Sequence, residues 1–261
     1  MQTFLLCRPD YFKIEYSINP WMIDEPVNPD IAKMQWDSLK ATIETMGAKV
    51  KVIEPAKGLP DMVFAANAGI VHEDKFVVST MKHKERHEES KHYSSWFQKM
   101  GYQVIELIPG VSFEGCGDAL LHCDSLIGGY GYRSDLLALE VTAGSLGLSL
   151  YDLKLRDPMF YHLDTCFCKV SETSAIYYPE AFCIGEIEKL KGIVDLIPVT
   201  EADARLFMCN SMLVNNVLLI PSNISEIDNK LRNSYGIKTC VVDVSEFLKS
   251  GGSIQCLSLK I

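Results

Sequence analysis

The sequence predicts an α/β protein in which five small units close into a propeller-like arrangement. Strand-like and helix-like segments alternate along the 261 residues, and an order of hairpin, helix and strand recurs about five times. Each unit would hold roughly 52 residues, although the units share no visible sequence identity. A doubly wound parallel sheet is the alternative. That fold needs a glycine-rich turn after its first strand, and here the first strand runs into CRPDYF.

The first half of the chain contains the elements expected for the first units. In chain order they are a strand at 3–7, an amphipathic helix at 30–47, a strand at 48–54, a hairpin at 69–79, a charged helix that ends at Gly101 and a strand at 103–108. The apolar side chains of the first helix fall near helical spacing. Gly47 stands where the C-cap of this helix is expected.

The second half repeats the same order of elements. In chain order we expect a hairpin at 119–130, a helix at 134–147, a strand at 148–155, a strand-like segment at 165–179, a helix at 180–191, a strand at 194–199, a helix at 224–235, a strand at 239–244 and a closing strand. No proline-rich, serine-rich or low-complexity tract divides the chain. Residues 1–261 are therefore predicted to form a single domain.

Composition restricts the class of protein. With 48% hydrophobic and 23% charged residues and a mean hydropathy near zero, the chain is expected to be a soluble globular protein. Its longest apolar runs, such as 216–221, are too short to cross a bilayer, and residues 1–8 lack the features of a signal peptide. The net charge of −9 argues against nucleic acid as a partner and suits a small or cationic ligand better.

Nine cysteines without a secretory signal predict a reduced, cytoplasmic protein. Cys166 and Cys168 would share one face of a strand, but no second ligand pair follows at zinc-finger spacing, so we interpret both as buried thiols. His83 and His87 lie four residues apart and could bind a metal, but a solvated helix face is the preferred interpretation. We expect neither a metal nor an organic cofactor.

Three residues have the types needed for covalent hydrolysis. Cys256 follows a Gly-Gly turn, and a thiol of ordinary pKa, about 8.5, is mostly protonated at neutral pH. His162 could activate that thiol, and Glu114 could orient the histidine. Taken singly, a histidine in an apolar strand is more often a core residue, and a cysteine near the C-terminus is more often inert. Residue types and spacing therefore leave a cysteine hydrolase as one hypothesis among others.

Four segments in one order resemble the guanidino-modifying enzymes of the pentein superfamily: LPDMVFAANAG, FEGCGDAL, FYHLDTCFC and SGGSIQCLSL. This superfamily includes arginine deiminase, dimethylarginine dimethylaminohydrolase, amidinotransferases and the cyanobacterial-type arginine dihydrolase. RPDYFKIEYSINPWM, HKER and GYGYRS are similar to the arginine dihydrolase branch. The resemblance extends from the first strand to the last residues. It implies a five-bladed α/β propeller, in agreement with the order of the elements.

By this resemblance, Cys256 is the nucleophile, His162 the general acid and base, and Glu114 the carboxylate that orients the histidine. The resemblance also implies a set of substrate-binding residues. These are Asp61, Asp118 and Asp164 around the guanidinium, and Arg86 and Arg133 at the substrate α-carboxylate, for which an arginine fork is suited.

Asn67 departs from the deiminase and dimethylargininase pattern, in which an aspartate stands at this position, whereas the arginine dihydrolase branch also has asparagine. An aspartate suits a cationic guanidinium, but an asparagine offers both a donor and an acceptor and could hold a neutral ureido group as well. The resemblance therefore implies that citrulline stays bound for a second hydrolysis. The alternative is an uncharged turn-forming residue before Ala68 and Gly69.

The expected activity is that of an arginine dihydrolase, which converts L-arginine into ornithine, carbon dioxide and two ammonia through a covalent thiouronium intermediate. The alternatives are a deiminase or a dimethylargininase that releases citrulline and, from another class, a non-catalytic arginine-binding protein. The expected partner is a small-molecule substrate, without nucleic acid or membrane. The sequence leaves open whether the chain forms a homo-oligomer.

Overall fold

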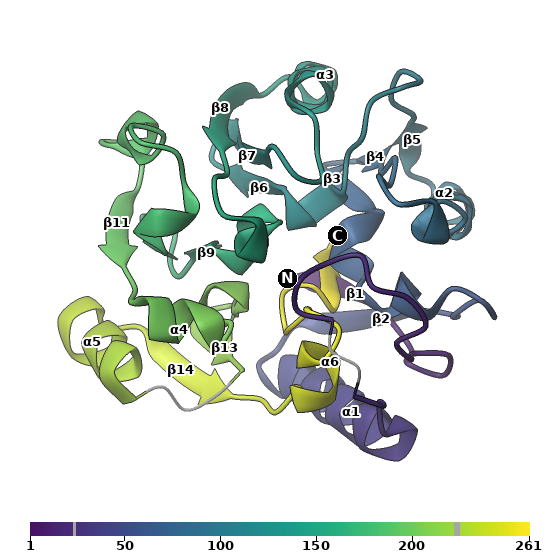
Figure 1. Ribbon diagram of the computed structural model, residues 1–261, viewed down its shortest axis with the longest axis horizontal. Helices are drawn as coiled ribbons and strands as arrows, with labels where there is room; N and C mark the ends of the chain where they lie inside the picture. Colours follow the sequence, from purple (N-terminus) through teal and green to yellow (C-terminus); the bar gives the residue numbers. More distant parts are fainter. Residues whose placement is uncertain (23–24, 222–224) are drawn as a thin grey trace.

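Five three-stranded sheets surround a common centre in the computed structural model, which describes residues 1–22, 25–221 and 225–261 (Figure 1). In chain order the strands are β1 (Thr3–Cys7), β2 (Lys49–Ile53), β3 (Gly69–His72), β4 (Lys75–Val78), β5 (Gln103–Ile105), β6 (Ala119–His122), β7 (Ser125–Tyr130), β8 (Ser149–Lys154), β9 (Phe167–Lys169), β10 (Ser174–Tyr177), β11 (Asp195–Pro198), β12 (Met212–Val214), β13 (Val217–Ile220), β14 (Lys238–Val241) and β15 (Ser258–Lys260). The predicted fold class is confirmed.

Each sheet repeats one topology. An antiparallel hairpin is followed by a strand that pairs in parallel with the second hairpin strand, as in β3-β4-β5 and β6-β7-β8. Parallel pairing requires a crossover connection, and in four of the five sheets this connection contains a helix of eleven or more residues, whereas the β10–β11 crossover contains only 3₁₀ turns. The α-helices are α1 (Pro29–Thr45), α2 (Glu89–Lys99), α3 (Leu136–Leu146), α4 (Glu201–Arg205), α5 (Ser225–Tyr235) and α6 (Ser245–Leu248). Figure 1 shows α1, α2, α3 and α5 at the periphery of the ring.

The hairpin turns also repeat. Glu73, Cys123 and Asn215 each occupy the first position of a two-residue turn, and each has a positive φ, between 48° and 55°. Non-glycine residues adopt this left-handed conformation uncommonly. Its recurrence at one position in three units supports a structural repeat that sequence identity does not reveal.

The fifth sheet joins the two ends of the chain. β15 pairs antiparallel with β1, and β1 pairs in parallel with β2, so this sheet combines the last strand with the first two. The backbone N–H of Ile261 also donates to the carbonyl of Thr3 at 2.9 Å. The ring is therefore closed by hydrogen bonds between chain ends rather than by a covalent connection.

Two expected helices differ from the structure. In place of a helix at 180–191, the chain forms two short 3₁₀ turns, Pro179–Ala181 and Ile187–Leu190. Gly185, with φ of 86°, lies between them, and this left-handed residue interrupts a helix. The charged helix is shorter than expected, because α2 begins at Glu89, beyond His83 and His87.

The helices present one apolar face to the core. In α1 the buried residues include Trp36, Leu39 and Ile43, and Asn28 caps the helix by accepting from the backbone N–H groups of Asp30 and Ile31. Within the described ranges, no helix is long and apolar enough to cross a membrane.

Candidate active site

Many of the candidate residues lie in five short segments that each precede an inner strand, whereas Arg86 and Arg133 lie between a hairpin and the following helix. Asn67, Asn210 and Cys256 each stand two residues before the first residue of β3, β12 and β15, respectively. Asp118 directly precedes β6, and Asp164 stands three residues before β9. The five-unit repeat thus brings side chains that are distant in sequence to one end of the ring.

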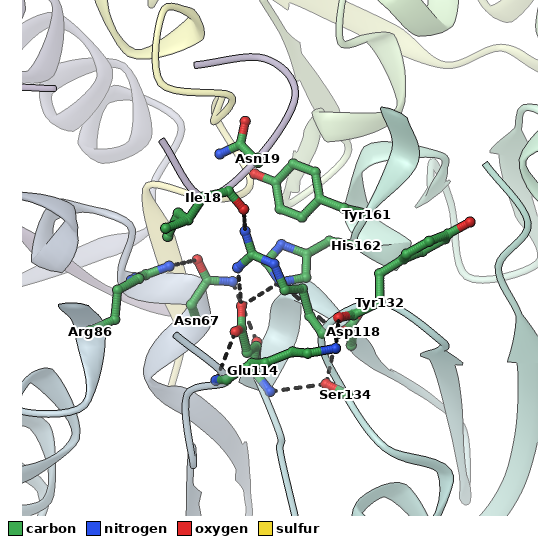
Figure 2. Close-up of polar contacts among 12 residues, drawn as sticks. Ile18, Asn19, Asn67, Arg86, Glu114, Asp118, Tyr132, Ser134, Tyr161 and His162 are labelled. Atoms are coloured by element: carbon green, nitrogen blue, oxygen red, sulfur yellow. Dashed lines mark hydrogen bonds and ion pairs between the residues drawn. The ribbon is translucent and has the colours of Figure 1, made fainter. Parts of the chain in front are cut away.

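Glu114 forms the centre of a buried polar network (Figure 2). Its Oε2 accepts from His162 Nε2 at 2.7 Å and from Arg133 Nη1 at 2.8 Å, and its Oε1 accepts from the backbone N–H of Lys82 at 3.1 Å. Burial alone would raise the pKa of Glu114, but the hydrogen bond from His162 and the charge of Arg133 lower it well below its usual value. Glu114 therefore stays ionised.

His162 is held by one ring nitrogen and leaves the other unused. Its Nε2 bonds to Glu114, whereas its Nδ1 has no hydrogen-bond partner among the described residues. Both the ring and its neighbours are tightly packed, since a Cβ on Gly117 would lie 3.2 Å from Nδ1 and 2.4 Å from Asn67 Nδ2. Nδ1 is thus the nitrogen available for proton exchange with a bound molecule.

Asp118 is engaged by the protein through both oxygens. Oδ2 accepts from Ser134 Oγ at 2.6 Å (Figure 2). Oδ1 accepts from the backbone N–H of Leu163 at 3.1 Å. Burial raises its pKa to about 6, although the charge of His162 opposes this. The sequence places Asp118 among substrate-lining residues, whereas in the structure its carboxylate anchors the segment that carries His162.

Cys256 and Asp164 form a second buried pair. The thiol donates to Asp164 Oδ2 at 3.2 Å, and Asn210 Nδ2 lies 3.1 Å from the sulfur. Burial raises the pKa of Cys256 well above its usual value, and the charge of Asp164 raises it further. Burial also raises the pKa of Asp164 to about 7. Without a ligand, Cys256 is therefore a neutral thiol.

Asn210 is a site residue that sequence reasoning missed. It is fully buried, and its Oδ1 accepts from the backbone N–H of Cys256 at 3.2 Å, while its Nδ2 donates to the carbonyl of Asp164 at 3.1 Å. It therefore joins the two segments that carry the thiol and its carboxylate partner. Its register, two residues before an inner strand like Asn67 and Cys256, is the signal that an alignment of the five units would have provided.

Arg86 and Asn67 are joined by a direct hydrogen bond. Arg86 Nη1 donates to Asn67 Oδ1 at 2.9 Å (Figure 2). Because the amide oxygen is engaged in this way, Asn67 presents its N–H group to its remaining neighbours, among them the carbonyl of Glu114 at 3.4 Å. Asp61 lies beside them, and its Oδ2 accepts from Tyr16 Oη at 3.0 Å. Burial raises the pKa of Asp61.

Arg133 connects the network to the N-terminal segment. Its Nη2 donates to the carbonyl of Ile18 at 2.7 Å, and its guanidinium lies 4.6 Å from the centre of the Tyr161 ring. The N-terminal segment around Ile18 thus covers the site. The next residue, Asn19, also holds this segment in place, because its Nδ2 donates to the carbonyl of Ser250.

The enclosed space at this site is small. Six of its lining residues carry the polar groups that a ligand would meet: Asp61, Asn67, Arg86, Arg133, Ser250 and Cys256. The volume is about 10 Å³, enough for about one water molecule. Ile18, in the covering N-terminal segment, borders this space.

A larger cavity of about 460 Å³ lies along the inner strands β3, β6, β9, β12 and β15. Asp164 borders this cavity, whereas Cys256 borders the small one. The Cys256–Asp164 pair therefore lies between the two spaces.

The residues considered as metal ligands are not gathered into a metal site. Among the described residues, no group of three or more histidine, cysteine or acidic side chains has the geometry to hold a metal ion. Cys166 and Cys168 are buried free thiols, and the structure has His83 and His87 flanking a 3₁₀ turn.

The chain is similar to known proteins over its full length. The family model for N,N dimethylarginine dimethylhydrolase, eukaryotic, matches residues 8–261. The bifunctional arginine dihydrolase/ornithine cyclodeaminase ArgZ of Synechocystis is 39% identical over 98% of this chain, which spans 37% of that longer protein. The N(G),N(G)-dimethylarginine dimethylaminohydrolase of Mycobacterium tuberculosis is 38% identical and aligns over 100% of this chain and 86% of its own length.

Solved structures agree with these matches. The N-terminal domain of ArgZ, described as a cyanobacterial arginine dihydrolase, was solved as a cysteine-to-serine variant bound to substrate. It superposes with a TM-score of 0.95 at 37% identity, over 100% of this chain and 98% of that domain. An asparagine-to-serine variant of the same domain, covalently bound to a reaction intermediate, gives a TM-score of 0.96 at 38% identity and covers 97% of that domain.

Proposed function

Because the chain belongs to the dimethylarginine dimethylaminohydrolase family, and is thus a guanidino hydrolase of the pentein type, we propose that it hydrolyses L-arginine twice. The products would be ornithine, carbon dioxide and two ammonia. The family contains both arginine dihydrolases and dimethylarginine dimethylaminohydrolases at nearly equal identity to this chain, so the choice between them depends on the site.

The observation that carries the proposal is the orientation of the Asn67 amide. Its oxygen accepts from Arg86, and one N–H of its Nδ2 points to the Glu114 carbonyl at 3.4 Å, which leaves the other N–H for a ligand in the small cavity that Asn67 lines. A ureido group differs from a guanidinium in having a carbonyl oxygen, which needs a donor. An aspartate here would offer only acceptors and would repel that oxygen. Asn67 therefore supports retention of citrulline for a second reaction.

The first half-reaction begins when the substrate activates the thiol. A cationic guanidinium beside Cys256 favours the thiolate and lowers the pKa that burial has raised. The Cys256 sulfur attacks the guanidinium carbon and forms a tetrahedral adduct, while Asp164 and Asp61 balance the positive charge. His162 donates the proton from Nδ1 to a terminal nitrogen, the carbon–nitrogen bond breaks, and ammonia leaves.

The second half-reaction restores the enzyme. Water loses a proton to His162 and attacks the carbon of the thiouronium, and the carbon–sulfur bond breaks to give citrulline and the thiolate. Repetition on the ureido carbon releases the second ammonia and leaves a thiocarbamate on Cys256. Its hydrolysis gives a carbamic acid, which loses carbon dioxide to form ornithine. Two waters are consumed for each arginine.

Product balance on L-arginine tests this proposal. The purified chain is incubated with L-arginine, and ammonia, citrulline and ornithine are counted over time. Two ammonia and one ornithine per arginine are expected. One ammonia with citrulline would mean that the reaction stops after one hydrolysis. Turnover of methylated arginines alone would instead assign the chain to dimethylarginine hydrolysis.

A further inference from the structure

Glu89 is a fully buried carboxylate that no part of the proposed reaction uses. It lies in the first turn of α2, where it accepts from Arg86 Nε at 2.9 Å through Oε1 and from Arg86 Nη2 at 2.8 Å through Oε2. This two-point pairing fixes the orientation of the guanidinium plane and also balances its positive charge.

The remaining contacts of Arg86 continue toward the substrate cavity. Nη2 also donates to the carbonyl of Asp61 at 3.1 Å, and Nη1 donates to Asn67 Oδ1 at 2.9 Å. Of the five N–H groups of an arginine, four are therefore engaged by the protein. One N–H is left for a ligand, which suits a single contact better than the two-point grip of an α-carboxylate expected from the sequence.

We propose that Glu89 is a positioning residue: acting through Arg86, it fixes the Asn67 amide with its oxygen away from the substrate and its N–H toward it. The inference rests on the proposed function, since it gives this orientation the task of retaining citrulline. Without the Glu89 carboxylate, the Arg86 guanidinium keeps only its contacts to the Asp61 carbonyl and to Asn67, so its plane is held less firmly. The Asn67 amide then offers its donor to the ureido oxygen only part of the time.

The burial of this chain of contacts explains why a single group can have this effect. Glu89, Arg86 and Asn67 are each at least 97% buried. Water therefore does not replace a lost protein partner, and a buried polar group that loses its partner reorients or takes another. Hydrogen bonds to charged groups are among the stronger ones in proteins, so loss of one should change a rate ratio by at least about tenfold.

The test is the partition between citrulline release and ornithine formation in Glu89→Gln. We expect the ratio of citrulline to ornithine to rise by at least about tenfold, with the rate of the first ammonia release within about threefold of wild type. Glu89→Asp, which keeps the charge but shortens the side chain, should fall between the two. An unchanged ratio in folded Glu89→Gln would overturn the inference.

A matched control is Asp228→Asn in α5. Asp228 is also a largely buried carboxylate paired with an arginine, and both of its oxygens accept from Arg232 Nε, at 2.9 Å and 3.0 Å. It lies at the opposite side of the ring from α2 (Figure 1). Its product ratio should equal that of wild type. A similar rise in this variant would mean that the ratio reports stability alone, and the inference would be wrong.

The double variant Glu89→Gln/Asn67→Asp separates positioning from a purely structural role. Because Asn67→Asp is expected to make citrulline alone, the readout is KM for arginine: if Glu89 acts through Asn67, Glu89→Gln should not raise KM further in the Asn67→Asp background, whereas independent effects would multiply. Should Glu89→Gln fail to fold, the same comparison is made with Glu89→Asp.

Should wild type release only citrulline, the proposed function fails. Glu89 is then judged by KM for arginine, expected to rise about tenfold at nearly constant kcat, and an unchanged KM refutes the positioning role.

Discussion

The thiol of Cys256 donates a hydrogen bond to the carboxylate of Asp164 at 3.2 Å, and both groups are buried. Burial raises the pKa of Cys256, and the charge of Asp164 raises it further, because a thiolate and a carboxylate at this distance would repel one another. The Cys256 side chain is therefore a neutral thiol in the free protein, and a nearby cation is needed to favour loss of its proton. In a guanidino hydrolase, the substrate is that cation.

Replacement of Cys256 by serine tests the nucleophile. A hydroxyl fits the same space and can donate to Asp164, but it is far less nucleophilic than a thiolate. We expect turnover to be lost and the Tm to stay within about 2 °C of wild type. Ammonia release by this variant, measured with the same assay as the wild type, would contradict a covalent mechanism through Cys256.

Asp164→Asn should make the folded chain more stable at high pH while abolishing its activity. The pKa of Asp164 is raised to about 7 in the folded chain from 3.8, so the folded state holds its proton more tightly, and stability falls as pH rises from about 4 to 7. The amide removes this penalty. At pH 8 we expect the variant to be more stable by roughly 2–4 kcal/mol, with the difference vanishing near pH 4.

Denaturant unfolding of wild type and Asp164→Asn at pH 4 and pH 8 provides this measurement. Activity should be lost in the variant at both pH values, because the carboxylate that faces the guanidinium is gone. A difference in stability that does not depend on pH would show that Asp164 is not a buried carboxylate with a raised pKa.

Asn67→Asp should convert a two-step enzyme into a one-step enzyme. A carboxylate can still accept from Arg86 and suits the guanidinium, but it offers no donor to the ureido oxygen of citrulline. We expect ammonia per arginine to fall from two to one, with citrulline as the product. Asn216→Asp, on an exposed hairpin turn, is the control and should leave the balance unchanged. Ornithine formation by Asn67→Asp would refute the role given to the amide.

Gly117→Ala should damage the site more than the fold. A Cβ there would lie 2.4 Å from Asn67 Nδ2 and 3.2 Å from the His162 ring, so both side chains must shift. We expect kcat to fall by at least about tenfold, with a stability loss of about 1–3 kcal/mol from overpacking. Gly144→Ala, in α3 with nothing within 4 Å, should stabilise the chain by about 0.5–1 kcal/mol and keep full activity. Equal kcat in both variants would contradict the close packing described for the site.

The element order was predictable because it depends on local patterns. Alternating apolar residues and turn signals mark the hairpins, and helical spacing marks α1 and α3, so the five-unit arrangement followed from the order alone. The helix expected at 180–191 was wrong because Gly185 takes a left-handed conformation that apolar spacing does not report. The roles of Cys256, His162 and Glu114 came from the family resemblance rather than from spacing.

The contacts that complete the site were not predictable in the same way. Asn210 is 46 residues from Cys256, and Asp164 is 92 residues from it. No local pattern records such distances. Glu89 was not predicted as a site residue for another reason. It stands in a segment rich in charged residues and so resembles an exposed helix residue, and only the packing of α2 against the ring buries it. Only the structure shows which of the charged side chains are buried.

The pairing of β1 with β15 has a consequence for how activity is acquired. Cys256 lies two residues before β15, so its position depends on a strand that can join the ring only after the first strand is in place. A contact between residues some 255 positions apart forms late, because closing so long a loop is entropically unfavourable. We therefore expect the reactive thiol to enter its site late in refolding. Recovered activity should lag behind recovered secondary structure and report the moment at which the ring closes.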